Sequence, residues 1–519
     1  MKKNKSRATL PAAKSDGVSV KHKATSKSAH ASKIYLINKD ALLFSGIALV
    51  LFLIIRHFFP VPDLIPDSRG YILGAITDSE VGYRPMGICV ALARIHQLDP
   101  SIEMVAYCQF FLHVMSALTL SHAFLINFNF SVAWRRILYA VLLLNPILLH
   151  LCNAIFSDSL FISLNILWVA FFLYLIRKPN WLVLASLLLL LWCSMFVRYN
   201  ALAYPLVIAL GLLFVSNKMM RWTGIAVSFA IAAVFYITVT NKMDAITNCK
   251  VLSGFSGWQL ATNAMTFYKV KPRAPIVSND PQLIALDYNS RKYIDTMASK
   301  NADYRKGPAM DFLWGSEAPF KRFEYIFASR THATDIFANW VAVSVVLNKY
   351  GALLIKQYPF DFFQYYLMPN IGAYFFPDME VLGKYNTVSV KLIPALQQWY
   401  DLPEQIQNGY VDAPGIYNKP GQYLYSFLSL AFVGMCIAWW VNRKKWVLPP
   451  DTQKVLFVII IFWVCKTGFD ILAAPCVLRY EVMLASILCG PVLIFTQVII
   501  TRRVKERQLK DLQPASQHK

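Results

Sequence analysis

Long, nearly uncharged runs of apolar side chains are the feature that most constrains how this chain can fold. Stretches 41 to 59, 181 to 197 and 482 to 500 are examples. As helices, such stretches are long enough to cross a hydrocarbon layer roughly 30 Å thick. Charged residues make up only 15% of the chain, whereas soluble domains carry about 25%. The sequence therefore predicts an all-α polytopic membrane protein, and it excludes a soluble enzyme, a secreted disulfide scaffold and a free nucleic-acid-binding protein.

The distribution of positive charge predicts how the chain is threaded through the membrane. Residues 1 to 40 hold ten Lys or Arg against two Asp, and residues 501 to 519 hold six against two acidic residues. Four short connections between apolar runs are also basic. Because basic loops stay on the cytosolic side, both termini are predicted to be cytosolic. The pattern then gives about ten spans, at 41 to 59, 104 to 127, 136 to 153, 159 to 176, 181 to 197, 201 to 216, 223 to 240, 425 to 442, 454 to 471 and 482 to 500.

These spans divide the chain into successive parts. A disordered basic cytosolic tail, 1 to 40, precedes seven spans in 41 to 240, and three more spans in 425 to 500 precede a basic cytosolic tail, 501 to 519. Between spans 7 and 8 lies a large outer region of mixed composition, 241 to 424. This topology predicts a multi-pass protein of a bacterial inner membrane, with its active site on the periplasmic, extracytoplasmic face.

The first outer segment, 60 to 103, is acidic whereas the inner loops are basic. Its Ile88, Leu92 and Ile95 recur at helical spacing, which indicates a short amphipathic helix lying on the membrane. An acidic loop held at the lipid surface is a place where a general base can be expected.

The second outer segment, 241 to 424, is where acceptor specificity is expected. Its apolar stretch Trp340 to Lys356 is interrupted by Asn348-Lys349, which favours an interfacial helix over a further span. The aromatic residues between 358 and 366 are typical of the headgroup level of a membrane. Candidate acceptor contacts in this segment are Asp244, Asp280, Asp287 and the aromatic residues near Trp258.

Tight outer connections place ionisable residues at the ends of the predicted spans. These connections are Ser157-Asp158-Ser159, Arg198-Tyr199-Asn200 and Arg479-Tyr480-Glu481. Charges near the membrane interior are costly and usually pair with one another or line an aqueous cavity. Lys466 and Asp470 lie one helical turn apart in the penultimate span. They form an ion pair, or Lys466 joins Arg198 and Arg479 in a cationic pocket for a lipid phosphate.

Two motifs in the first outer segment resemble a known family. They are Pro66-Asp67-Ser68-Arg69-Gly70-Tyr71-Ile72, soon after the first span, and Tyr83-Arg84-Pro85-Met86-Gly87. Both are similar to the first outer loop of GT-C superfamily glycosyltransferases, such as the mannosyltransferase-like and aminoarabinose-transferase-like membrane enzymes. Members place a catalytic Asp or Glu and then an Arg-Pro-small motif in this loop, and Asp67 and Arg84 match these positions. Asp158, Arg198 and Arg479-Tyr480 resemble later acidic and arginine-bearing elements of the family.

The resemblance implies an inverting glycosyltransferase that moves a sugar from a polyprenyl-phosphate-type lipid donor to a glycan, lipid or protein acceptor. Attack by an acceptor hydroxyl calls for a carboxylate base within hydrogen-bond reach. Asp67 is the candidate and Asp63 its competitor, although Asp67 could instead cap a helix that begins near Ser68. Asp158 is the second catalytic candidate, orienting the acceptor or a metal, and its alternative role is to cap the span that starts at Ser159.

Cations near the membrane surface are expected to stabilise the departing lipid phosphate. The candidates for this donor-phosphate site are Arg84, Arg198, Lys466 and Arg479, and the residues expected to support the site are Arg69, Tyr71, Tyr199 and Tyr480. Asp158 stands alone where a paired-acid motif would indicate a metal, so a divalent cation is an open alternative as cofactor. Membrane lipids are expected partners and nucleic acid is not.

Two other functions fit parts of the pattern. An outer-face glycan ligase or polymerase would also use a lipid-linked sugar, but with a long oligosaccharide donor. In a polytopic transporter, Lys466, Asp470 and the short spans 181 to 197 and 201 to 216 would line a coupled path. The sequence shows no obvious repeated halves, and the long segment 241 to 424 lies on one face, which disfavours the transporter.

Overall fold

The computed structural model describes residues 38–511, apart from 332–334, 387–391, 407–409 and 444–447. These residues belong to one compact unit, Tyr35–Lys519. Their regular secondary structure is helical, and β pairing within the described ranges is limited to two isolated bridges. The predicted all-α class is confirmed. The tail segments 1–37 and 512–519 lie outside the described residues.

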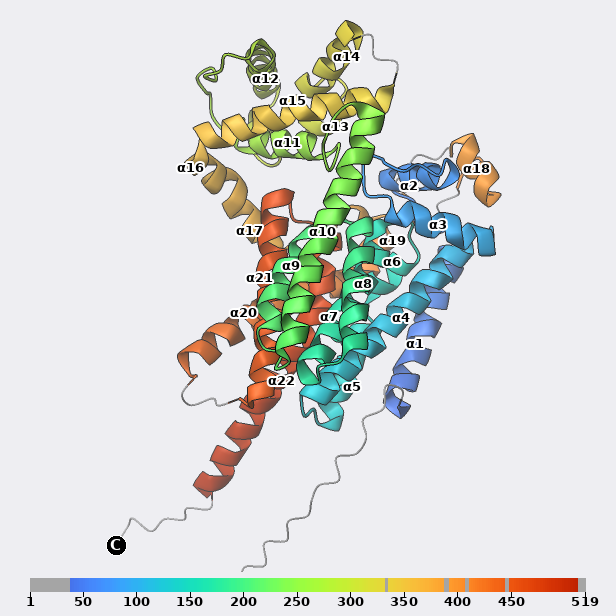
Figure 1. The fold of residues 1–519 in the computed structure, drawn as a ribbon, viewed down its shortest axis with the longest axis vertical. Helices are drawn as coiled ribbons and strands as arrows, with labels where there is room; N and C mark the ends of the chain where they lie inside the picture. Colours follow the sequence, from blue (N-terminus) through green and yellow to red (C-terminus); the bar gives the residue numbers. More distant parts are fainter. Residues whose placement is uncertain (1–37, 332–334, 387–391, 407–409, 444–447, 512–519) are drawn as a thin grey trace, which may run out of the picture. The chain divides into compact units, whose positions relative to one another are not determined.

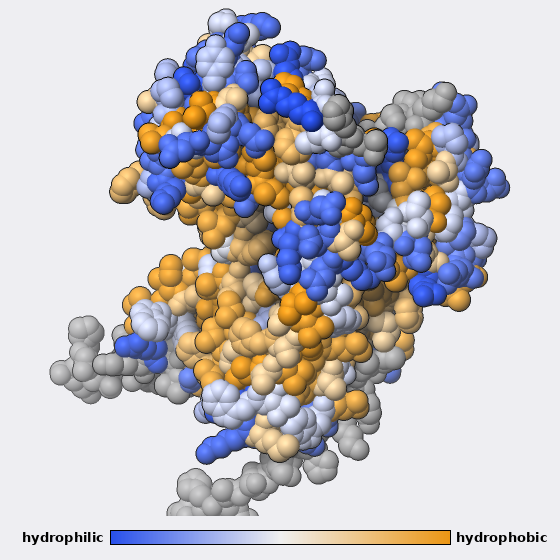
Figure 2. Space-filling view, turned by 45° about the horizontal axis from the view of Figure 1, so that its top comes forward, coloured by the Kyte–Doolittle hydropathy of each residue, from blue (hydrophilic) through white to orange (hydrophobic). Residues whose placement is uncertain are grey.

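Long apolar helices lie side by side and form the larger part of the fold (Figure 1). They enclose one extended apolar core, while apolar side chains such as Leu42 and Val234 point outward and stay exposed. On the face shown in Figure 2, hydrophobic residues cover much of this bundle and hydrophilic residues gather above it. The bundle helices are α1 (Lys39–Phe58), α4 (Ile102–Asn127), α5 (Val132–Leu143), α6 (Pro146–Cys152), α7 (Ser157–Arg177), α8 (Trp181–Val197), α9 (Tyr204–Leu212), α10 (Lys218–Thr247), α20 (Lys419–Val441), α21 (Pro450–Ala473) and α22 (Leu478–Asp511).

Within the described ranges, nine helical segments are long and apolar enough to cross a membrane, and eight of them coincide with predicted spans. One of these eight, predicted at 136 to 153, is broken into α5 and α6, because Asn145 accepts a hydrogen bond from Ile147 N at 3.1 Å and Pro146 opens a new helix. Two further predicted spans, 181 to 197 and 201 to 216, are shorter apolar helices, α8 and the pair η1 (Tyr199–Ala203) and α9. The predicted multi-span architecture is confirmed.

The ninth long segment is α15 (Ile336–Gln357), which the sequence favours as an interfacial helix. It packs on α11 (Ser256–Tyr268) and lies crosswise to the bundle helices in Figure 1. The two backbones approach closely at Gly257, where a Cβ would lie 1.8 Å from the Ser344 carbonyl oxygen. Together with α12 (Pro281–Lys300), α13 (Met310–Trp314) and α14 (Pro319–Thr331), these helices enclose a second apolar core, and they are called the α11–α15 layer below.

Two predicted acceptor contacts have structural roles in the α11–α15 layer. Asp287 is 1% exposed and accepts hydrogen bonds from Tyr268 and Tyr350, at 2.7 and 3.2 Å. Asp280 caps α12 by accepting from Gln282 N at 2.9 Å. Trp258 is fully buried. Asp287 and Trp258 are therefore unavailable to a substrate, whereas Asp280 is only partly buried.

A third apolar cluster holds the segment that follows α1. This segment folds into α2 (Pro66–Ile76) and α3 (Gly87–Leu98), which confirms the short helix predicted around Leu92. At Gly87, a Cβ would lie 2.6 Å from the backbone of Phe196 at the end of α8. The remaining helices are η2 (Ala302–Arg305), α16 (Pro359–Phe362), η3 (Phe363–Leu367), α17 (Met368–Phe375), η4 (Glu380–Gly383), α18 (Pro394–Tyr400) and α19 (Ala413–Tyr417).

Candidate functional site

A short parallel bridge ties the segment after α1 to the segment before α7. Asp63 N donates to Asn153 O at 2.8 Å, and Ile155 N donates to Asp63 O at 3.0 Å. The Ser68 hydroxyl then donates to the Ile155 carbonyl at 2.8 Å. As a result, the first turn of α2, which carries Asp67, lies beside the first turn of α7, which carries Asp158.

A second isolated bridge joins Asp378 to Val477, and Leu478 N donates to Asp378 O at 2.9 Å. This bridge places Glu380 next to Arg479, which opens α22. Glu380 has a left-handed backbone, with φ at +50°, a conformation that is uncommon outside glycine and raises the energy of this turn.

Asp67 is held between two arginines. Arg84 Nη2 lies 2.9 Å from its Oδ1, and Arg479 Nη1 lies 3.7 Å from its Oδ2. Among the described residues, Oδ2 accepts no hydrogen bond, and the side chain is 16% exposed. Asp67 does not cap α2, because the side-chain hydrogen bond at the start of this helix comes from Ile65 N to Ser68 Oγ, at 2.9 Å. The carboxylate is thus flanked by a guanidinium at each oxygen, closely at Oδ1 and at a longer distance at Oδ2, and the side chain stays partly exposed.

Arg479 connects Asp67 to the other carboxylates of the site. Its guanidinium lies 3.1 Å from Glu380 and 3.9 Å from Asp158, and its side chain is only 9% exposed. Asp158 is also buried and accepts a hydrogen bond from Arg198. The ring of Tyr480 contacts both guanidiniums, with Arg198 at 4.4 Å and Arg479 at 4.7 Å from its centroid. Such stacking fixes the planes of both cations.

Lys466 lies apart from this network. Its side chain is 2% exposed, pairs with Asp470 and lies 3.5 Å from Glu481. It also donates to the Tyr480 carbonyl at 2.9 Å. The predicted Lys466–Asp470 ion pair is confirmed, and because Lys466 lines neither cavity described below, its contact with the site is through the backbone of Tyr480.

The other predicted residues differ in their placement. Asp63 is fully buried, where it accepts from Asn386 N at 2.7 Å and lies 3.3 Å from His150 Nε2, so its role is to anchor the segment. Arg69 is exposed on α2 without an ion pair to any described residue. Tyr199 packs on Phe235, at 6.1 Å between ring centroids.

Tyr71 follows Asp67 by one turn of α2. Its hydroxyl lies 3.1 Å from the Ser157 hydroxyl, which links α2 to α7. Burial raises the pKa of Tyr71 to about 12, so the phenol stays neutral at physiological pH. A neutral phenol adds a hydrogen-bonding group here without adding charge.

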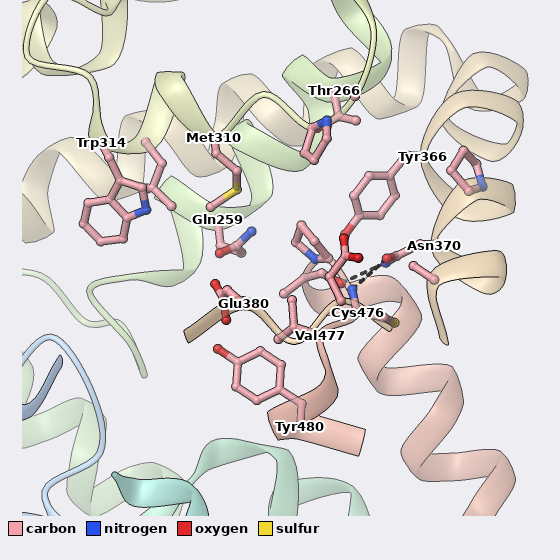
Figure 3. Close-up of a pocket in the computed structure, with 18 of the residues that line it drawn as sticks. Gln259, Thr266, Met310, Trp314, Tyr366, Asn370, Glu380, Cys476, Val477 and Tyr480 are labelled. Atoms are coloured by element: carbon pink, nitrogen blue, oxygen red, sulfur yellow. Dashed lines mark hydrogen bonds between the residues drawn. The ribbon is translucent and has the colours of Figure 1, made fainter. Parts of the chain in front are cut away.

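Two cavities meet at Asp67 and Arg84. The first, of about 950 Å³, extends to α17 and the end of α21 and is called the α17–α21 cavity. Figure 3 shows Gln259, Met310 and Trp314 across it from Glu380 and Tyr480. The second, of about 820 Å³, extends along α2 to α14 and α15 and is called the α14–α15 cavity. Both are lined by Pro66, Asp67, Arg84, Phe255 and Trp314.

The carboxylates of this site do not fit a bound divalent cation. Asp67, Asp158 and Glu380 each face an arginine. The described part of the chain contains no group of three or more His, Cys, Asp or Glu side chains suited to a metal ion. The charge balance of the site therefore comes from guanidinium groups.

Sequence patterns did not reveal Glu380 or Phe255. Both lie in the segment between predicted spans 7 and 8, where no periodic signal singles them out. Glu380 reaches the site through the Asp378–Val477 bridge, and Phe255 contacts Arg84 with its ring centroid 5.3 Å from the guanidinium carbon. Only a long-range contact brings these residues to the motifs of the first outer segment.

No protein-family model matches this chain, and no curated protein matches it. A search of solved structures finds the archaeal oligosaccharyltransferase AglB from Archaeoglobus fulgidus, in complex with an inhibitory peptide and a dolichol-phosphate. The sequence identity is 11% and the TM-score is 0.40. The match covers 92% of this chain and 52% of that one, so this chain spans about half the length of that structure.

Proposed function

We propose that this protein is a GT-C-type integral-membrane glycosyltransferase, which moves a sugar from a polyprenyl-phosphate-type lipid to an acceptor hydroxyl. The observation that supports this function best is the position of Asp67, where the two cavities meet. Its Oδ1 is held by Arg84, while Oδ2 accepts no hydrogen bond from the described residues. A site between two substrates needs a carboxylate oriented in this way.

In the proposed reaction, Asp67 Oδ2 accepts the proton of the acceptor hydroxyl as its oxygen attacks the anomeric carbon. The bond between that carbon and the phosphate oxygen breaks, and the lipid phosphate leaves with the electron pair. Arg84 and Arg479 line the α17–α21 cavity and stabilise the growing charge on the phosphate. Attack from the face opposite the leaving group inverts the anomeric centre.

The lipid donor is assigned to the α17–α21 cavity. Apolar residues of α17 and of the segment after α21 form one side of it, including Ala373, Ala474 and Val477. Because α21 is long and apolar enough to span a membrane, its end is a natural exit for a polyprenyl chain. The acceptor is then assigned to the α14–α15 cavity, on the other side of Asp67.

Asp158, Arg198 and Lys466 act as positioning residues in this proposal. Arg198 and Asp158 line neither cavity, but Asp158 pairs with Arg198 and lies 3.9 Å from Arg479. Lys466 fixes the backbone of Tyr480 by donating a hydrogen bond to its carbonyl oxygen. The basic tails support cytosolic termini and an active site on the opposite face of a bacterial inner membrane.

The test is release of free polyprenyl phosphate from a panel of polyprenyl-phosphate sugars by purified protein. Wild-type protein should turn over a donor, and Asp67→Asn should lower this rate about 100-fold or more, the scale for loss of a general base. Asp78→Asn is the matched control, because Asp78 is exposed in the same segment, lines neither cavity, and has a left-handed backbone that Asn tolerates. Equal rates for Asp67→Asn and wild type would remove Asp67 as the base, and no turnover of any donor would overturn the function.

A further inference from the structure

The far end of the α14–α15 cavity is a chamber lined by apolar, aromatic and polar side chains. It is formed by the Tyr83 segment and by residues of α14 and α15, while Trp314 of α13 lines both cavities. Three of its aromatic side chains keep much of their surface exposed: Tyr83 is 42%, Trp314 is 56% and Tyr325 is 64% exposed. Open aromatic rings in a concave site offer binding surface for a ligand with an apolar face.

A buried carboxylate completes this chamber. Glu324 is 8% exposed and lines the cavity. Its Oε2 accepts a hydrogen bond from Lys321 at 2.9 Å, whereas Oε1 accepts none from the described residues. Oε1 is not one of the fully buried atoms that lack a partner, so it is accessible from the cavity. It can therefore accept a hydrogen bond from a ligand bound there.

Lys321 is held in place and does not fill the chamber as a mobile cation. Its ammonium lies 4.1 and 4.9 Å from the ring centroids of Trp340 and Trp258. These two indoles are themselves stacked, with centroids 4.0 Å apart. The ion pair between Lys321 and Glu324 is therefore rigid, and the carboxylate is preorganised.

Tyr83 joins the chamber to the reaction centre. Its ring makes edge contacts with Phe337 and Trp340, at 5.0 and 5.3 Å between centroids. The next residue, Arg84, holds Asp67. A ligand packed on Tyr83 would therefore have its near end directed along the cavity toward Asp67.

We infer that this chamber is a carbohydrate-binding subsite, so that the acceptor is a glycan with at least one sugar unit beyond the one that reacts at Asp67. This inference rests on the proposed function. A pyranose ring presents a C–H face that packs on an aromatic ring and hydroxyl groups that donate to a carboxylate. The rings of Tyr83, Trp314 and Tyr325 and the Oε1 atom of Glu324 supply these two kinds of contact.

The cavity lining is mostly apolar, but its polar side chains favour a glycan over a lipid acceptor. Lys321 and Glu324 line it together with Thr77, Ser79 and Glu80. An acyl chain here would remove water from these groups without replacing their hydrogen bonds, which is costly. A sugar replaces them, because each of its hydroxyl groups both donates and accepts.

The experiment uses labelled full-length protein in lipid nanodiscs on an array of mono- to hexasaccharides, followed by titration of the strongest binder. Tyr83→Ala should weaken this binding roughly tenfold, the scale of one aromatic contact. Glu324→Gln should weaken it on the order of tenfold to a hundredfold, as expected for a hydrogen bond to a charged group. Tyr83→Phe keeps the ring and should bind far more tightly than Tyr83→Ala. Tyr288→Ala is the matched control, because Tyr288 is 58% exposed on α12 and lines neither cavity.

Two results would overturn the subsite: no binding of any saccharide at millimolar concentration, or equal affinity of wild type, Tyr83→Ala and Glu324→Gln. Release of polyprenyl phosphate is measured in the same preparations. Donor turnover without saccharide binding refutes the subsite and leaves glycosyl transfer standing. Saccharide binding that depends on Tyr83 and Glu324, without donor turnover, supports the subsite and refutes the transferase.

Discussion

The ion pair between Asp158 and Arg198 is predicted to stabilise the site through a measurable coupling. The two side chains are 5% and 17% exposed, so each charge depends on the other for compensation. Asp158→Asn leaves Arg198 without a carboxylate partner, although it keeps its contact with the Tyr480 ring. Arg198→Met leaves Asp158 with Arg479, at 3.9 Å.

The expected magnitudes follow from these residual contacts. Removal of one partner from a buried ion pair costs about 3 to 5 kcal/mol. Asp158→Asn should fall near the lower limit, about 3 kcal/mol, because the cation–π contact of Arg198 survives. Arg198→Met should cost less, about 2 kcal/mol, because Asp158 retains Arg479. In the double variant neither charge is left unpaired, so its cost should fall short of the sum by about 2 kcal/mol.

The free energies come from reversible unfolding of the purified protein in a detergent titration, followed by tryptophan fluorescence. Donor turnover is measured in parallel, since Arg479 loses part of its orientation in the Asp158→Asn variant. If the loss of unfolding free energy in the double variant equals the sum of the losses in the two single variants, the side chains do not stabilise each other and Asp158 does not position the arginines.

Two further predictions concern packing and pH. Gly257→Ala should destabilise the protein by about 3 kcal/mol, because the new Cβ would lie 1.8 Å from the Ser344 carbonyl oxygen. Gly372→Ala in α17 is the control: its Cβ would meet no atom within 4 Å, so it should be neutral or stabilising in the same unfolding assay. Equal effects of the two variants would contradict the close α11–α15 contact. Burial raises the pKa of Tyr71 from 10.0 to about 12, so its contribution to stability is complete below pH 10 and is lost as the pH rises toward 12. Wild-type stability should therefore fall more steeply than that of Tyr71→Phe across this window, and parallel pH profiles would refute the role of burial.

The sequence predicted the helices that repeat an apolar pattern and missed breaks that depend on single residues. The predicted span at 181 to 197 has the same bounds as α8, because charged and polar residues flank the apolar run directly at both ends. The break at Asn145-Pro146 is a local feature inside an apolar run, so hydropathy alone did not show it. In the segment 241 to 424, the helices of the α11–α15 layer pack on one another, and no periodic pattern in the sequence indicated their bounds.

Candidate residues for the site could be chosen from charge and position, but their roles could not. Asp67, Arg84, Asp158, Arg198 and Arg479 lie in one network of ion pairs. Asp63 and Lys466 carry the same kinds of charge at similar depths, yet the fold buries them in other contacts. A linear motif does not tell which of two nearby carboxylates stays partly exposed.

The sequence by itself determined that this chain is helical and built to span a membrane, because apolar periodicity and charge are local properties of the residues. It also brought Asp67 and Arg84 to attention, since both lie in one short segment. The tertiary structure alone decided that Asp67 stands where two cavities meet, that Glu380 reaches Arg479 and that Glu324 and Tyr83 line the same cavity. Each of these depends on contacts between residues that are far apart in the chain, and such contacts are set by the packing of whole helices.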